Sequence, residues 1–108
     1  MPSFLVQASY TSEALASLIK NPQNRMEIVR KSVEGLGGKL VGGWMSFGDY
    51  DIVLIADLPD NVSAAAIALA AAAGGSLKAI KTTPLLNSEE GLAAVKKAAS
   101  SGYTPVQK

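Results

Sequence analysis

The chain of 108 residues contains neither cysteine nor histidine. Without cysteine there can be no disulfide, no thiolate nucleophile and no zinc–thiolate site. Without histidine the chain cannot build a Ser-His-Asp triad, use imidazole as a general base, or bind zinc, haem or non-haem iron through imidazole. The two absences favour proton transfer or simple binding over metal or redox chemistry, and we expect no cofactor.

Charged residues are also scarce, at 18% of the chain against about 25% in an average soluble protein. Ten basic and nine acidic side chains give a net charge of +1, and only Arg25 and Arg30 are arginines. Because phosphate binding needs clustered cations, we expect no nucleic-acid partner. The low charge suggests that part of the surface is covered by a second copy, in a homodimer or a higher homo-oligomer.

The sequence has no long apolar run. The longest one, residues 62–73, contains Ser63 and is too short and too rich in alanine to span a bilayer. Residues 1–7 lack the basic region, apolar stretch and cleavage site of a signal peptide. We therefore expect no membrane partner, and a cytoplasmic location is the default prediction.

Hydrophobic periodicity predicts four strands and three helical regions. The strands are expected at residues 4–10, 39–47, 50–58 and 77–83, the last of them ended by Pro84. The helical regions are expected at residues 12–36, 62–73 and 88–99, and Asn21-Pro22 kinks or divides the first one. Gly42-Gly43 indicates a bulge or the close approach of another backbone. Residues 100–108 are expected to form a flexible tail.

The order β-α-β-β-α-β, followed by a C-terminal helix, predicts an α+β, ferredoxin-like fold in a single domain over residues 1–108. In this fold strands 1 and 3 lie at the centre of a four-stranded antiparallel sheet, with the helices on one face. The expected edge strands carry Lys39, Lys78 and Lys81, charges that discourage pairing with other chains. Residues 52–56 are apolar on both faces, so the face without helices should be buried against a second subunit.

Four short motifs follow one another along the chain. They are Ile19-Lys20-Asn21-Pro22 with Arg25, Gly37-Gly38-Lys39, Gly48-Asp49-Tyr50-Asp51-Ile52-Val53, and Asp57-Leu58-Pro59-Asp60. Together they resemble the GYD domain family, over a region from Phe4 to Lys97. The resemblance implies a ferredoxin-like fold of the dimeric α/β-barrel type. It implies no activity and therefore supplies no catalytic residues.

The candidate pocket residues are Tyr10, Trp44, Asp49, Tyr50 and Asp51. Two carboxylates that flank a phenol could polarise or deprotonate a substrate. The same residues beside glycine are also common in hairpin turns. Tyr10, Trp44 and Phe47 could line a pocket between the sheet and the helices, or they could simply fill the core or an interface.

Lys20 and Arg25 are the candidate anion-binding residues, because they flank the predicted helix break, where backbone amides are free to bind an anion. The alternative is that both are ordinary solvated surface residues. Whether the protein is an enzyme stays open. If it is one, its acid–base groups should come from the following set: Asp49, Asp51, Tyr10, Tyr50, Lys20 or Lys81.

Two functions remain open at this point. The first is a small-molecule-binding or cofactor-independent protein of the dimeric α/β-barrel type, by analogy of fold. The second is a non-catalytic homo-oligomeric assembly or partner-binding protein, whose alanine-rich helix, including Ala64, Ala65, Ala66 and Ala68, makes subunit contacts. A pocket of roughly a few hundred Å³ with converging polar groups favours the first. A solidly packed sheet interface favours the second.

Overall fold

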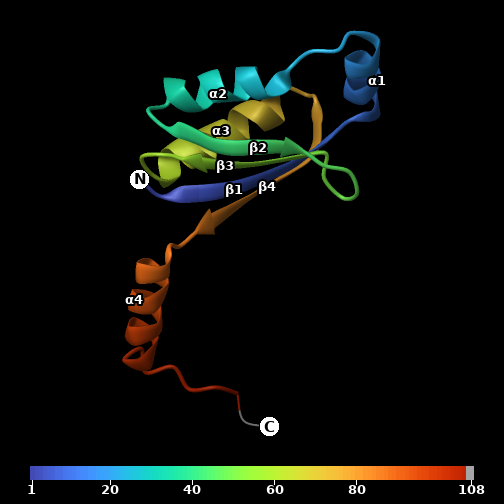
Figure 1. The fold of residues 1–108 in the computed structure, drawn as a ribbon. Coiled ribbons are helices and arrows are strands. Elements are labelled where there is room, and N and C mark those ends of the chain that lie inside the picture. The colour runs from blue at the N-terminus through green and yellow to red at the C-terminus, as the bar shows by residue number, and fades with distance from the viewer. Residues whose placement is uncertain (107–108) are drawn as a thin grey trace.

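The computed structural model describes residues 1–106, and over that range the chain forms four strands and four helices (Figure 1). The strands are β1 (Ser3–Tyr10), β2 (Lys39–Met45), β3 (Ile52–Asp57) and β4 (Leu77–Leu85). They form one antiparallel sheet in the order β2-β3-β1-β4. The helices are α1 (Ser12–Lys20), α2 (Arg25–Gly35), α3 (Asn61–Ala73) and α4 (Ser88–Ala99). The predicted α+β, ferredoxin-like fold is confirmed, with β1 and β3 central.

The first helical region is divided into two helices. Helix α1 ends at Lys20, immediately before Asn21-Pro22, because a residue that precedes proline is disfavoured in the α conformation. Helix α2 begins where the Asn24 side chain accepts a hydrogen bond of 3.1 Å from the backbone N–H of Met26. The break directs α1 past the end of the sheet, while α2 lies over it (Figure 1).

Helices α2 and α3 cover one face of the sheet, where α2 packs on β2 and α3 on β4 (Figure 1). Alternate residues of the strands point into this layer and are buried. The core cluster consists of Phe4, Val6, Leu40, Leu54 and Ala56 from the strands, with Val33, Leu58 and Ala64. This burial on a single face follows from the period of two in β1 and β3.

The opposite face of the sheet, which we call the open face, is covered by no helix within residues 1–106. It presents Leu5, Val53, Ile55 and Leu85, all half-buried by their neighbours on the sheet. Leu5 lies directly opposite Ile55 in the pairing of β1 with β3. The expectation that the third strand is apolar on both faces is therefore confirmed.

Three strand ends differ from the prediction by two residues. Strand β4 does not stop before Pro84 but continues through it to Leu85. An edge strand tolerates proline because one row of its N–H groups has no partner strand. Strand β2 ends at Met45 and β3 begins at Ile52, because Ser46 closes the connecting loop: its backbone N–H donates to the Asp51 carbonyl at 2.8 Å.

The C-terminal helix α4 has the predicted bounds and a complete capping box between Asn87 and Glu90. None of its residues is buried, and Leu92 and Val95 are 56% and 68% exposed. It projects on the side of the sheet opposite α2 and α3 (Figure 1). Residues 101–106, part of the predicted tail, form neither helix nor strand. The same prediction for residues 107–108 lies outside the described residues.

Candidate ligand-binding site

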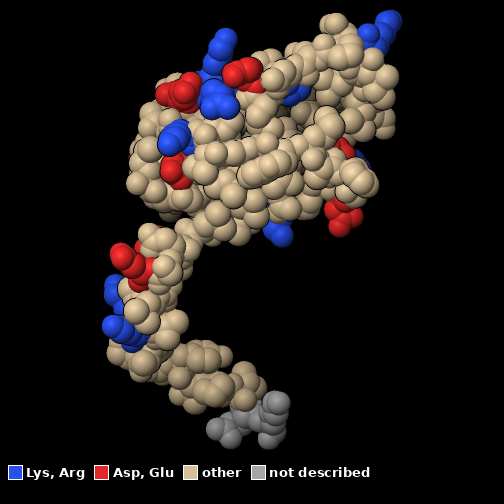
Figure 2. Space-filling view, viewed as in Figure 1, with Lys and Arg blue, Asp and Glu red and all other residues tan. Residues whose placement is uncertain are grey.

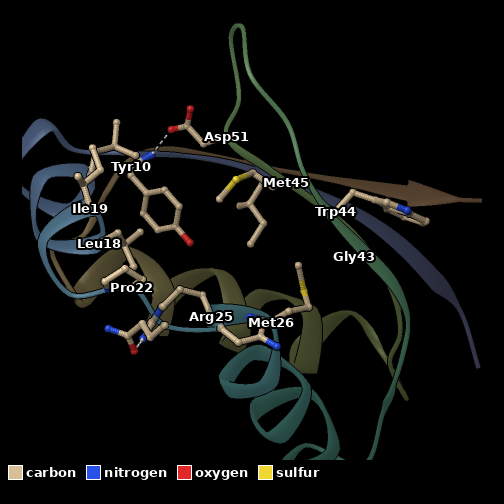
Figure 3. A pocket seen from close by; sticks show the side chains of 14 residues that line it. Tyr10, Leu18, Ile19, Pro22, Arg25, Met26, Gly43, Trp44, Met45 and Asp51 are labelled. Atoms are coloured by element: carbon tan, nitrogen blue, oxygen red, sulfur yellow. Dashed lines mark hydrogen bonds between the residues drawn. The ribbon is translucent and has the colours of Figure 1, made fainter.

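A cavity of about 560 Å³ lies between α1, the start of α2 and the adjoining ends of β1, β2 and β3 (Figure 3). Its walls are mainly apolar. The apolar side chains that line it are Leu15, Leu18, Ile19, Pro22, Met26, Met45 and Ile52. The polar side chains that line it are Tyr10, Gln23, Asn24, Arg25 and Asp51. We call this space the first cavity.

The local sequence explains why this space is open. The break at Asn21-Pro22 separates α1 from α2, and no residue of α1 is buried in the core. The apolar residues Leu15, Leu18 and Ile19 of α1 line the cavity instead. On the other side, Gly43 lets Met26 lie directly against β2, since a Cβ at this position would collide with the Met26 sulfur. Met26 thereby forms part of the wall.

Asp51 fixes the position of Tyr10. Its Oδ2 accepts a hydrogen bond of 2.8 Å from the backbone N–H of Tyr10, and its own backbone N–H donates to the Ala8 carbonyl at 2.8 Å. The Tyr10 ring projects from the end of β1 into the first cavity, and its hydroxyl points toward the start of α2 (Figure 3). The Asp51 carboxylate is therefore engaged in holding the end of β1.

Arg25 is the first residue of α2 and is half-buried. Its guanidinium Nη1 donates to Gln23 Oε1 over 3.4 Å, which is a long hydrogen bond. Within residues 1–106 the one salt bridge joins Arg30 to Glu27, so Arg25 has no carboxylate partner in the described part of the chain. The first cavity therefore contains a cation that forms no salt bridge with a described residue, although the Asp51 carboxylate lines the same cavity.

A second cavity, of about 240 Å³, lies between α2, α3 and the sheet. The small side chains of the alanine-rich helix, among them Ala64, Ala70 and Ala71, leave this space unfilled. Tyr10, Arg25 and Ile52 line both cavities, so the two adjoin.

The structure brings four of the seven predicted site residues to the first cavity: Tyr10, Trp44, Asp51 and Arg25. Trp44 contributes least, because its indole turns away from the cavity and back over Gly42 (Figure 3). It is 56% exposed on the open face.

The other candidates lie elsewhere. Asp49 and Tyr50 belong to the β2–β3 loop and line neither cavity; their backbone carbonyls accept hydrogen bonds from the hydroxyls of Ser9 and Ser46. Lys20 is exposed at the end of α1, also outside both walls. Lys81 is exposed on β4, opposite Gln7 on the open face. Phe47 is 99% exposed.

The charged side chains are unevenly distributed over the surface. Charged side chains gather over α2 and along α4, and much of the surface between them is uncharged (Figure 2). Within residues 1–106 no three Asp, Glu, His or Cys side chains are grouped so that they could hold a metal ion. In the same part of the chain no helix has both the length and the apolarity needed to cross a membrane.

Two comparisons connect this chain with known proteins. The family model of the GYD domain matches residues 4–95, from β1 into α4. The chain is also similar to a protein of Thermus thermophilus named "Glutamine synthetase and cystathionine beta-lyase binding protein". The two are 30% identical over 78 residues, which cover 72% of this chain and 82% of the relative. The resemblance expected from the four motifs is thereby confirmed.

Proposed function

This chain belongs to the GYD domain family, and from the geometry of the structure we propose that it is a small-molecule-binding protein that acts as a homodimer. Membership of the family by itself assigns no chemistry. The first cavity carries this proposal. Its volume of about 560 Å³ falls within the roughly 300–1,000 Å³ of small-molecule sites, and like them it combines apolar walls with a few polar groups.

The geometry supports binding more than turnover. Of the acid–base candidates named from the sequence, Tyr10 and Asp51 line the first cavity, and the Asp51 carboxylate is already engaged with the backbone N–H of Tyr10. General acid–base catalysis needs a group within hydrogen-bond reach of a substrate proton. Tyr10 and Arg25 are suited to holding a ligand through hydrogen bonds.

A thermal-shift screen tests this proposal, because a ligand that binds the native state raises the melting temperature by mass action. The panel contains small apolar acids, alcohols and amides. Leu18→Glu places a charge in the cavity wall and should abolish every shift, while the fold survives because α1 has no buried residue. Ala16→Glu, on an exposed position of the same helix, is the control. An absence of shifts across the panel would refute the proposal.

The open face supports the homodimer part of the proposal. Leu5, Val53, Ile55 and Leu85 make the centre of that face apolar, and two such faces packed together form a sandwich with the helices outside. This is the dimeric α/β-barrel arrangement that the family resemblance implies. Because α4 projects on the same side of the sheet (Figure 1), it would lie beside the second subunit.

A second candidate function is binding to a partner enzyme, and the name of the Thermus thermophilus relative favours it. Exposed apolar side chains on α4 provide a surface: Leu92 and Val95 are 56% and 68% exposed. Purified glutamine synthetase and cystathionine β-lyase should then bind the chain in sedimentation-velocity experiments, and Leu92→Glu with Val95→Glu should weaken the complex. If neither enzyme binds at micromolar concentration, this candidate is excluded.

A further inference from the structure

Tyr10 and Arg25 lie where the two cavities adjoin, and each lines both of them. A ligand at this junction would contact the Arg25 side chain and the Tyr10 hydroxyl while its remaining atoms lay among apolar walls. The polar groups at this point therefore determine which kind of head group the site accepts.

The polar groups at the junction are mainly hydrogen-bond donors. Arginine carries N–H donors and no acceptor, and a phenol can donate its O–H. Asp51, the acidic residue in the wall, is engaged with the backbone N–H of Tyr10. Arg25 has no carboxylate partner among the described residues and makes one long bond, to Gln23. A half-buried cation beside apolar walls is stabilised by an anion, to which it makes charge-assisted hydrogen bonds.

The charge and the walls limit the anion further. Among residues 1–106, Arg25 is the one cationic residue in either wall, and Lys20 lies outside both. One cation matches a singly charged head group such as a carboxylate better than a phosphate with nearly two charges. The second cavity offers the rest of the ligand an apolar lining from Val29, Ile67 and the alanines of α3, which favours a hydrocarbon body.

We infer that the ligand is a small apolar monocarboxylate, whose carboxylate binds Arg25 and the Tyr10 hydroxyl and whose hydrocarbon body occupies the gap between α2 and α3. This inference rests on the proposed small-molecule function of the same cavity. It adds the chemical class of the ligand and the residues that select it.

Isothermal titration calorimetry with octanoate and octan-1-ol tests the inference, because the two probes have the same hydrocarbon chain and differ in charge. The wild type should bind octanoate at least about tenfold more tightly than octanol. This factor is the lower end of the range expected for a hydrogen bond to a charged group. Arg25→Gln should weaken octanoate binding by about 10- to 100-fold and change octanol binding by less than about twofold. Tyr10→Phe should weaken octanoate binding by a smaller factor, because it removes a neutral donor.

Arg30→Gln is the matched control, since Arg30 lies on the same helix, pairs with Glu27 and lines neither cavity. Circular dichroism of each variant without ligand checks that the fold is kept. If octanol binds the wild type as tightly as octanoate, or if Arg25→Gln leaves octanoate binding unchanged, the carboxylate assignment is wrong while small-molecule binding stands. If neither probe binds but a compound of the thermal-shift panel raises the melting temperature, the monocarboxylate inference is wrong and small-molecule binding stands. If neither probe binds and no compound of the panel gives a shift, both fail.

Discussion

Substitution by alanine should change the stability in opposite directions at two glycines, one at the end of α2 and one just beyond it. A Cβ at Gly38 would collide with the Asp57 carbonyl oxygen and lie 2.8 Å from Leu58 Cδ2, and the backbone there cannot move aside easily. We expect Gly38→Ala to lower the free energy of unfolding by about 1–3 kcal/mol through overpacking. Gly35, the last residue of α2, has nothing within 4 Å of the added Cβ.

Gly35→Ala is therefore the matched control, and it should raise the free energy of unfolding by up to about 0.5–1 kcal/mol, because alanine favours the helix over glycine. Urea denaturation at neutral pH measures both variants. Equal stabilities for the two would contradict the close packing of Gly38 against the end of β3.

Asp60 should make the stability of the protein depend on acid pH. The backbone N–H and the hydroxyl of Ser63 both donate hydrogen bonds of 2.8 Å to Asp60 Oδ1. These bonds, the backbone one first, hold the pKa of Asp60 below its ordinary value of 3.8. Since the folded-state pKa is depressed, the stabilisation is present above the unfolded value and is lost as the pH falls through the folded value.

Asp60→Asn keeps an oxygen that can cap α3 but removes the titration. Urea midpoints measured at about pH 5 and about pH 2 should therefore fall more for the wild type than for Asp60→Asn. An identical fall in both proteins would show that the cap does not contribute to the acid dependence.

The site could be predicted in part from single residues. The alternation of β1 predicts the face on which Tyr10 lies. The pair Asn21-Pro22 predicts the helix break that precedes Arg25. The face on which Trp44 lies is harder to predict, because the pairing of β2 with β3 shifts register between Leu40 and Gly42. One extra residue reverses the alternation. Counted from buried Leu40, Trp44 belongs to the helix side, but the bulge turns its indole to the open face.

At the scale of elements, regular periodicity was enough to predict the helices and strands, while their ends depended on tertiary contacts. Strand β4 passes through Pro84 because it lies at the edge of the sheet. The ends of β2 and β3 depend on hydrogen bonds from Ser46 to Asp51 and Tyr50. No local pattern specifies either one. The first cavity likewise arises from the direction of α1 relative to the sheet, which periodicity does not encode.

Helix α4 should be dispensable for the stability of the rest of the domain. It has no buried residue, and its capping box lies within the helix itself and the residue before it. Truncation after Asn87 should therefore change the free energy of unfolding by no more than about 0.5 kcal/mol, as for other surface changes. Chemical denaturation of the truncated chain, measured in the background of Ile55→Glu to exclude subunit contacts, gives this value. Loss of a cooperative transition would show that α4 supports the core.

At the scale of the whole molecule, the proposed homodimer depends on the open face. One buried cluster joins residues from β1, β2, β3, α2 and α3, with Ile80 of β4 packed against it, so α2 and α3 already cover the helix side of the sheet. The open face is also apolar, and within residues 1–106 no helix covers it. A sheet that is apolar on both faces is stable in water when both are covered, and a second copy offers an identical apolar face.

Ile55→Glu should dissociate the proposed homodimer. Ile55 lies opposite Leu5 at the centre of the open face, and a pair of related carboxylates buried at a twofold interface would be strongly unfavourable. In the single chain the side chain is half-buried, so the variant should still fold. Light scattering at micromolar concentration should give the mass of two chains or more for the wild type and of one chain for the variant. Ile28→Glu, the same substitution at a position of α2 that is 44% exposed, should leave the mass unchanged. A wild type with the mass of one chain would refute the homodimer and, with it, the barrel arrangement.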